Sequence, residues 1–143
     1  MFTEDQIVEI VDLLATLTPD TKIYIGTDSV RFQKGERWYA KYATVCVIHM
    51  NGNKGGRIIT ARATEPDYDL KLGRPSMRLM NEVIKSCEAY NQLAPFIDEF
   101  QIEIHADVST DPNRGSNCVA SQAAGYALGV TGLPESAIKL KPE

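Results

Sequence analysis

The spacing of apolar residues near the N-terminus predicts a helix. Apolar residues recur every three or four positions from Ile7 to Leu17, which is the period of an amphipathic helix. Thr3 and Gln6 stand at the spacing of a capping box, which satisfies free backbone N–H groups in a first helical turn. We therefore expect a helix that begins after Thr3 and ends before Pro19.

Five later segments have the β-branched and aromatic content, or the alternation, of strands. They are Lys22–Thr27, Arg37–Met50, Arg57–Ala63, Gln101–Ala106 and Ser136–Lys141. A glycine-bearing turn at 51–56 joins the second segment to the third, because glycine readily adopts the positive φ of tight turns. The first three strands are therefore expected to be consecutive and antiparallel.

Two further helices are predicted among these strands. One begins at Pro75 and Ser76 and runs to about Leu93, and the other lies near Cys118–Leu128 and is rich in alanine. A helix on either side of the fourth strand is typical of parallel crossovers. We therefore expect one α/β domain over residues 1–143, with a mixed five-stranded sheet and helices on both of its faces.

Composition and charge narrow the function classes only slightly. The chain has 143 residues, 43% of them hydrophobic, and no apolar run approaches the length of a membrane span. Its N-terminus is acidic, unlike a signal peptide, and its three cysteines lack C-x-x-C spacing. We therefore expect a cytoplasmic protein without disulfides or a zinc ribbon. The net charge of −4 argues against a strongly basic nucleic-acid binder, but residues 1–20 carry five acidic residues and no basic one, so the rest of the chain is nearly neutral.

Three acidic residues stand where they could carry chemistry. Asp28 and Asp107 each follow a predicted strand, and Glu82 lies in the middle of the central helix. Ligands of open α/β sheets bind beyond the carboxyl ends of the strands, and oxygen-rich sites suit Mg²⁺ or Mn²⁺. Such ions can promote phosphodiester cleavage, and crowded carboxylates predict a raised pKa for at least one acid. The alternative is that each Asp forms a turn or caps a helix and that Glu82 faces solvent.

Other polar residues lie near these acids in the sequence. His105 shares a strand face with Asp107, so it could bind a ligand, orient one or move protons, or it could be a buried, hydrogen-bonded histidine. Arg74 and Arg78 could contact phosphate or pair with Asp67 or Asp69. The candidates for phosphate binding are Ser29, Arg74, Arg78, Asn113 and Ser116, of which the last two could instead cap the following helix.

Basic and aromatic residues interleave from position 31 to position 42. Such a pattern can hold nucleic acid through phosphate contacts and base stacking. A hairpin with one solvated face is the simpler interpretation, because alternating strands often look this way. The residues are Arg31, Lys34, Arg37, Trp38, Tyr39, Lys41 and Tyr42.

Four motifs in order carry a resemblance to a known family. They are Gly26-Thr27-Asp28-Ser29, Glu82-Val83 within a helix, His105-Ala106-Asp107 before a glycine-bearing loop, and Ile138-Lys139-Leu140-Lys141-Pro142. Together they resemble the YkuK-like family of bacterial proteins, whose fold is ribonuclease H-like. The resemblance runs from about Lys22 to Pro142.

The resemblance implies a nuclease that depends on Mg²⁺ or Mn²⁺ and acts on RNA or DNA, with Asp28, Glu82 and Asp107 as catalytic, metal-holding acids. Such nucleases usually take a fourth acid from a final helix, which we expect this chain to lack; Asp111 or Glu143 could substitute. The alternative is a catalytically inactive nucleic-acid-binding or assembly domain. We expect the N-terminal helix to cover apolar surface left by the missing helix, within one chain or across a homodimer.

Overall fold

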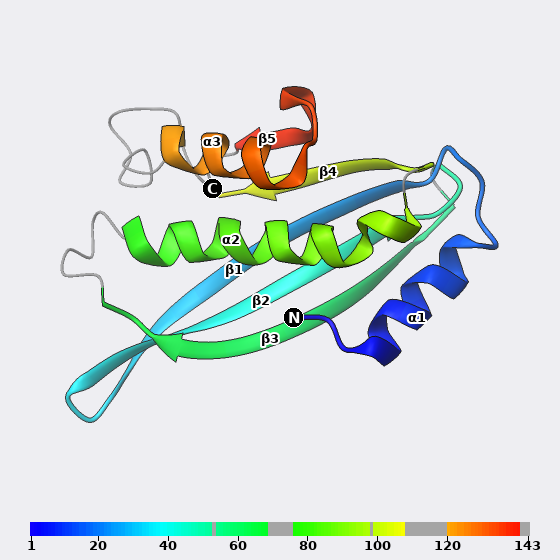
Figure 1. Ribbon diagram of the computed structural model, residues 1–143. Helices are drawn as coiled ribbons and strands as arrows, with labels where there is room; N and C mark the ends of the chain where they lie inside the picture. The colour runs from blue at the N-terminus through cyan, green and yellow to red at the C-terminus, as the bar shows by residue number, and fades with distance from the viewer. Residues whose placement is uncertain (53, 69–75, 98, 108–119, 141–143) are drawn as a thin grey trace.

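The computed structural model describes residues 1–52, 54–68, 76–97, 99–107 and 120–140 (Figure 1). In these residues the strands form one sheet in the order β3-β2-β1-β4-β5. The strands are β1 (Lys22–Lys34), β2 (Arg37–His49), β3 (Gly56–Pro66), β4 (Gln101–Ala106) and β5 (Ile138–Leu140). The helices are α1 (Glu4–Leu14), α2 (Ser76–Leu93) and α3 (Ala120–Thr131), with short 3-10 turns at Ala94–Phe96 and Glu135–Ala137.

The strand pairing confirms the predicted fold class. Strands β1, β2 and β3 pair antiparallel in sequence order, whereas β4 pairs parallel to β1 and β5 parallel to β4. The strand that carries Asp28 and the strand that leads into Asp107 are therefore adjacent and parallel, as expected. This adjacency brings two distant parts of the sequence to one end of the sheet.

Strand β1 is longer than its sequence predicts. We expected it to end at Thr27, but its ladder with β2 continues to the pair Lys34↔Arg37. A two-residue turn closes this hairpin, and Gly35 adopts a φ of 65° there. Since that conformation favours glycine, the turn lets both strands extend beyond the sheet. Asp28 thus lies inside β1 rather than after it.

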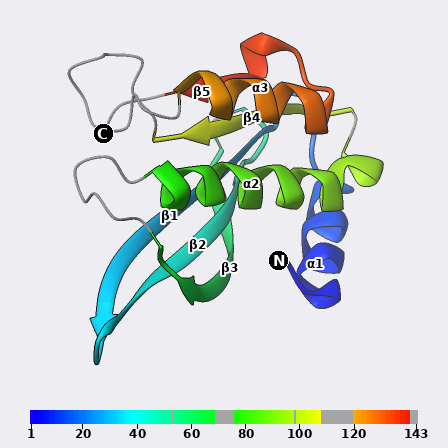
Figure 2. The same ribbon diagram turned by 60° about the vertical axis from the view of Figure 1, so that its left-hand side comes forward.

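The described helices lie on one face of the sheet, which differs from the expectation of helices on both faces (Figures 1 and 2). The buried apolar residues of the central strands all point to that face, among them Ile25, Cys46 and Ile104. The opposite face mixes polar and apolar residues, and its Val30 and Ile58 are 65% and 64% exposed. Only one face is therefore apolar enough to bury helices.

Two apolar clusters attach the helices to that face. Helix α1 buries Ile10 and Leu14 against β1, β2 and the end of α2, so its predicted packing on the sheet is confirmed. Its capping box forms as expected, since Thr3 Oγ1 accepts from the Gln6 backbone and Gln6 Oε1 accepts from the Thr3 backbone. The helix ends at Leu14, earlier than its apolar period suggests. The second cluster joins α2, α3 and β4, where Ala123 and Ala127 are buried.

The structure also bears on the cysteines, the last strand and the length of the helices. Cys46 and Cys87 are buried free thiols, and burial raises their pKa values to about 12 and 11. Ser136 lies in a 3-10 turn, so β5 begins later than expected. Cys118 and Lys141 lie outside the described residues. In the part of the chain that the structure describes, no helix has the length and apolar character to cross a membrane.

Candidate functional site

Helix α2 packs on β1 so that helix residues one turn apart contact strand residues two positions apart. Thr27 Oγ1 lies 2.8 Å from Ser86 Oγ of α2 and 3.0 Å from Thr44 Oγ1 of β2. Two residues further along β1, the Ser29 hydroxyl donates to Glu82, which lies one turn before Ser86. Four helical residues rise about 6 Å and two strand residues about 6.6 Å, so both pairs of contacts form together. This repeat places Glu82 directly over β1.

Asp28 and Asp107 come from the two parallel strands beside that point. The pairing of β1 with β4 ends at Gly26↔His105. Asp28 comes two residues after Gly26, and Asp107 comes two residues after His105. Both acids therefore lie at one end of the β1–β4 ladder, and Asp28 is exposed. The side chain of Asp28 leaves β1 on the face opposite to Ser29, because side chains alternate along a strand.

Ser29 connects the groups around Glu82. Its hydroxyl donates to Glu82 Oε2 and accepts from Arg78 Nη1 at 2.8 Å. Its backbone N–H donates to Asp28 Oδ1 at 2.9 Å. Arg78 lies one turn before Glu82 on α2, with 3.8 Å between Nη1 and Oε2. The site therefore holds a carboxylate and an arginine bridged by one hydroxyl.

Glu82 is a buried acid with an altered pKa. Glu82 is only 4% exposed. Its pKa is raised from 4.5 to about 8, chiefly because burial disfavours the charged form. The carboxylates of Asp28 and Asp107 raise the pKa further, whereas the Ser29 hydrogen bond and the Arg78 charge oppose the rise. The prediction that one crowded acid has a raised pKa is confirmed, and Glu82 does not face solvent.

The three acids do not form a ready cluster of metal ligands. Among the described residues, which include Asp28, Glu82 and Asp107, no three His, Cys, Asp or Glu side chains gather closely enough to hold a metal ion. Their oxygen donors are nevertheless those that Mg²⁺ and Mn²⁺ prefer. The donors therefore fit by chemistry, and Glu82 would have to exchange its bond with Ser29 for the cation.

His105 lies on the half-buried face of β4, and Asp107 comes directly after the strand ends. Its Nε2 is 2.9 Å from Glu103 Oε1, and its ring packs edge-on against Tyr24 at 5.0 Å between centroids. These contacts hold the imidazole on β4. A role beside a metal ligand stays a prediction.

The remaining candidates divide between this site and undescribed segments. Ser29 and Arg78 belong to the site, and Arg78 approaches Glu82 rather than Asp67. Asp67 instead pairs with Arg31 at 2.6 Å. Outside the described residues lie Asp69, Arg74, Asp111, Asn113, Ser116 and Glu143.

Sequence reasoning missed the buried hydroxyl contacts that set the position of Glu82. Thr27, Thr44 and Ser86 are 6%, 3% and 2% exposed, and their hydroxyls bond to one another. A signal was present, because Ser86 follows Glu82 by one helical turn and Thr27 precedes Ser29 by one strand repeat. Pairing those two periods would have predicted which face of α2 meets β1.

Comparisons with known proteins agree with this architecture. A family model described as ribonuclease H-like matches residues 5–143, nearly the whole chain. Neither the curated proteins nor the solved structures yielded a match. The match, the sheet order β3-β2-β1-β4-β5 and the helix-borne acid over β1 lead to one assignment. The chain belongs to the ribonuclease H-like family.

Proposed function

We propose that this protein is a divalent-metal-dependent nuclease that cleaves phosphodiester bonds of RNA or DNA, with Asp28, Glu82 and Asp107 holding the cation. One observation carries the proposal: α2 buries Glu82 near the end of the β1–β4 ladder, where the backbone of one strand reaches Asp28 and that of the other reaches Asp107. The raised pKa of Glu82 supports it, because both aspartates contribute to the rise. A cation there would offset three negative charges.

The chain's own residues have separable roles in this proposal. Bound Mg²⁺ or Mn²⁺ would activate water and stabilise the leaving oxygen. Arg78, at the start of α2, can donate to a phosphate oxygen once Glu82 turns to the cation. Ser29 keeps Arg78 and Glu82 in register until then, since its hydroxyl contacts both.

A nuclease assay on the purified protein tests the proposal. We expect Mn²⁺-dependent cleavage of labelled RNA or DNA oligonucleotides and its loss, by at least about 100-fold, in Asp28→Asn, because a missing ligand weakens both cation binding and charge stabilisation. Asp12→Asn, at an exposed position of α1, is the matched control and should retain activity. Equal cleavage by the parent and Asp28→Asn would contradict the proposal.

A second candidate function is a catalytically inactive nucleic-acid-binding or assembly domain. It is favoured by the bonds that occupy Glu82 and by the absence of a three-residue metal cluster among the described residues. Under this alternative, oligonucleotides would bind without cleavage at any Mn²⁺ concentration. Binding that persists in Asp28→Asn, with no turnover in the parent, would favour it.

The narrower expectations from sequence also remain proposals. We assign the chain to the YkuK-like group within the ribonuclease H-like family and to the cytoplasm, on its motifs and composition. We also propose a homodimer, for which the exposed Val30 and Ile58, on the face away from the described helices, offer apolar contact area. Sedimentation analysis of the full chain tests the dimer, and a monomer at micromolar concentration would contradict it.

A further inference from the structure

The β1–β2 hairpin reaches beyond the rest of the sheet and has a pocket at its base. Pairing of β2 with β3 ends at Tyr39↔Pro66, whereas β1 and β2 stay paired out to Lys34↔Arg37. A cavity of about 540 Å³ lies there, lined by the hairpin and by the residues that follow β3. This volume is within the range of small-molecule sites, roughly 300–1,000 Å³.

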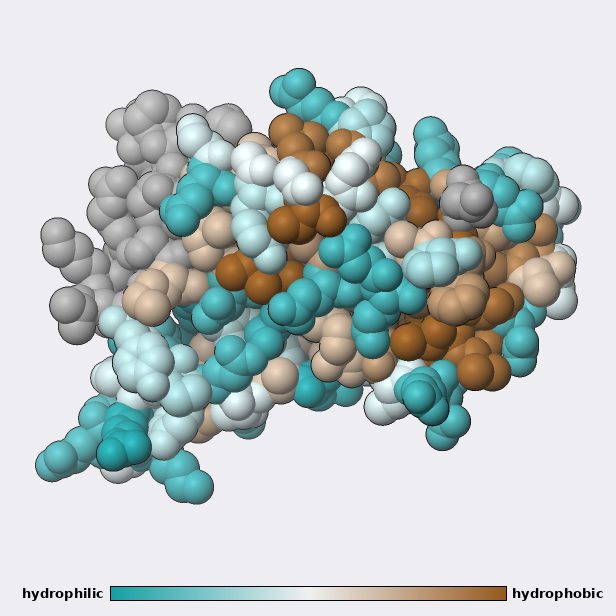
Figure 3. Space-filling model, in the orientation of Figure 1, coloured by the Kyte–Doolittle hydropathy of each residue, from teal (hydrophilic) through white to brown (hydrophobic). Residues whose placement is uncertain are grey.

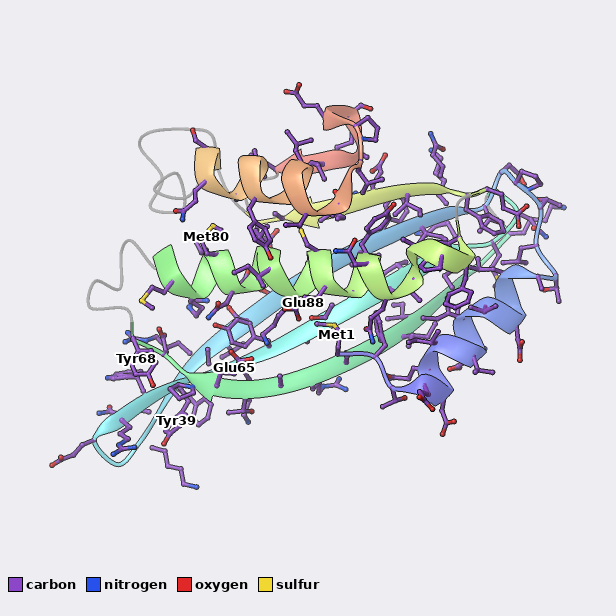
Figure 4. All side chains as sticks on the ribbon, viewed as in Figure 1. Met1, Tyr39, Glu65, Tyr68, Met80 and Glu88 are labelled. Carbon is purple, nitrogen blue, oxygen red and sulfur yellow. The ribbon has the colours of Figure 1, made fainter. Side chains whose placement is uncertain are left out.

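Aromatic rings are prominent in the lining of this pocket. Trp38, Tyr39 and Tyr68 all line it, and Figure 4 shows Tyr39 and Tyr68 at the same corner of the molecule, near the end of β3. Trp38 is 37% exposed and Tyr68 is 67% exposed. Exposed aromatic faces of this kind stack on flat, unsaturated rings such as nucleobases.

The pocket is held in place before any ligand binds. The Asp67 carboxylate pairs with Arg31 Nε at 2.6 Å, and the Asp67 side chain is 1% exposed. The Asp67 backbone N–H donates to the Trp38 carbonyl at 2.9 Å, and the Arg31 guanidinium lies 4.2 Å from the centre of the Trp38 ring. Because these contacts fix the indole, little side-chain freedom remains to be lost on binding.

The charge of the hairpin favours an anionic ligand. Residues 31–41 include four basic residues and one acid, Glu36, although the whole chain has a net charge of −4. Arg31 is already paired with Asp67, so the other three basic residues provide the excess positive charge. Figure 3 shows the projecting hairpin end in hydrophilic and neutral colours, with apolar surface elsewhere on this face. A ligand with a flat ring and nearby phosphates suits both features. The basic residues are Arg31, Lys34, Arg37 and Lys41.

The pocket also lies on a line with the acid site. Arg31 follows Ser29 by two residues, so both side chains leave β1 on the face covered by α2. Trp38 pairs with Gln33, which is about 17 Å along the strand from Asp28 at roughly 3.3 Å per residue. A single strand of a few nucleotides spans that distance.

We propose that this pocket binds one unpaired base of a single-stranded nucleic acid, by stacking on Trp38 and Tyr68, while the strand runs along β1 toward Ser29 and Arg78. The inference rests on the proposed function and deepens it, since it specifies a single-stranded substrate and the path of that strand along β1. Arg37, which also lines the pocket, supplies a phosphate contact at the hairpin end.

Fluorescence tests the pocket directly, because Trp38 is the only tryptophan of the chain. The full protein in EDTA is titrated with a ten-nucleotide single-stranded DNA, and binding is followed by tryptophan emission and by anisotropy of a labelled copy. We expect quenching of Trp38 emission and binding weakened about 5- to 150-fold in Trp38→Ala, the range for one lost base stack. Trp38→Phe should retain most of the affinity, and Tyr68→Ala should weaken it.

Three comparisons decide the result. Phe96→Ala, an exposed aromatic in the 3-10 turn after α2, should bind as the parent does. Equal affinity of the parent, Trp38→Ala and Tyr68→Ala, each shown to be folded by circular dichroism, would overturn the proposal. So would equal affinity for an abasic strand or a duplex of the same length.

The outcome separates this pocket from the proposed nuclease activity. Asp12→Asn, the exposed control of the cleavage assay, should bind the oligonucleotide as tightly as the parent. Base-dependent binding without Mn²⁺-dependent cleavage would support the base pocket and contradict the nuclease proposal. Mn²⁺-dependent cleavage, with binding and turnover unchanged in Trp38→Ala, would support the nuclease proposal and contradict the base pocket.

Discussion

Asp67 and Glu82 are both buried carboxylates beside an arginine, yet the two arginines contact them differently. Arg31 Nε lies 2.6 Å from Asp67 Oδ2 and forms a direct ion pair. Arg78 Nη1 lies 3.8 Å from Glu82 Oε2, and its shorter bond, 2.8 Å, goes to Ser29. Glu82 also shares its surroundings with two further acids, which raise its pKa.

This difference separates a carboxylate whose charge is directly compensated from one whose charge is not. Asp67 has its counter-charge built in, so the pair anchors the hairpin and the Trp38 ring. The negative charge of Glu82 is only partly compensated. Burial and the neighbouring acids raise its pKa by more than the Ser29 hydrogen bond and the Arg78 charge lower it. The first site should therefore lose stability when its acid is removed, and the second should gain.

The largest expected effect is at the hairpin. Asp67→Asn should lower the free energy of unfolding by about 3 kcal/mol, because Arg31 would remain largely buried without its counter-charge. Urea denaturation followed by Trp38 fluorescence measures this change. A loss below about 1 kcal/mol would mean that the pair does not anchor the hairpin.

Glu82→Gln should act in the opposite direction. The folded pKa of Glu82 is about 8 and its usual value 4.5, so the folded state keeps a proton that the unfolded state releases between these values. The stability of the parent should therefore fall as pH rises from about 4.5 to about 8. Replacing the acid should flatten that decline and raise stability at pH 8 by roughly 2 kcal/mol.

Urea titrations of both proteins at pH 5 and pH 8.5 check the sign. Parallel pH profiles for the parent and Glu82→Gln would show that Glu82 is not the group responsible. Glu4→Gln, at an exposed position of the first turn of α1, is a control that should leave the profile unchanged.

A divalent cation should stabilise the acid site and leave the hairpin unaffected. Mg²⁺ or Mn²⁺ at about ten times its dissociation constant should raise the melting temperature by about 3 °C, because it binds the folded state alone. Asp107→Asn should abolish the rise while the metal-free fold stays intact. Asp67→Asn should keep the rise from its own lower starting point; an unchanged melting temperature of the parent would argue against a cation site.

The smallest effect is expected at an exposed ion pair. Arg57 of β3 contacts Glu9 of α1, and their side chains are 52% and 41% exposed. Arg57→Ala should change the free energy of unfolding by at most about 0.5 kcal/mol, since water screens exposed pairs. A loss comparable to that of Asp67→Asn would show that burial does not explain the contrast between ion pairs in this chain.

Several features of the fold follow from short stretches of sequence. The capping residues of α1, the alternation of β4 and the span of α2 depend on neighbours within one turn or one strand, and all three match expectation. The order of helices and strands then restricts the topology, because parallel strands need a crossover. The adjacency of the strands that carry Asp28 and lead to Asp107 could therefore be predicted.

Long-range packing explains what could not be predicted. The extension of β1 through Asp28 to Lys34 depends on a partner strand and a two-residue turn. The gathering of α1, α2 and α3 on one face depends on how five strands align their apolar residues. No local period contains that information.

Residue types and their spacing were enough to indicate an acid site, since Asp28, Glu82 and Asp107 each stand at a recognisable point of a strand or helix. The character of each acid depends on burial and on neighbours that are remote in the sequence. Glu82 changes its pKa because α2 packs onto β1, and Asp67 becomes structural because the chain after β3 returns to Arg31. Charge in a protein interior depends on distance and solvent access, which are properties of the folded chain.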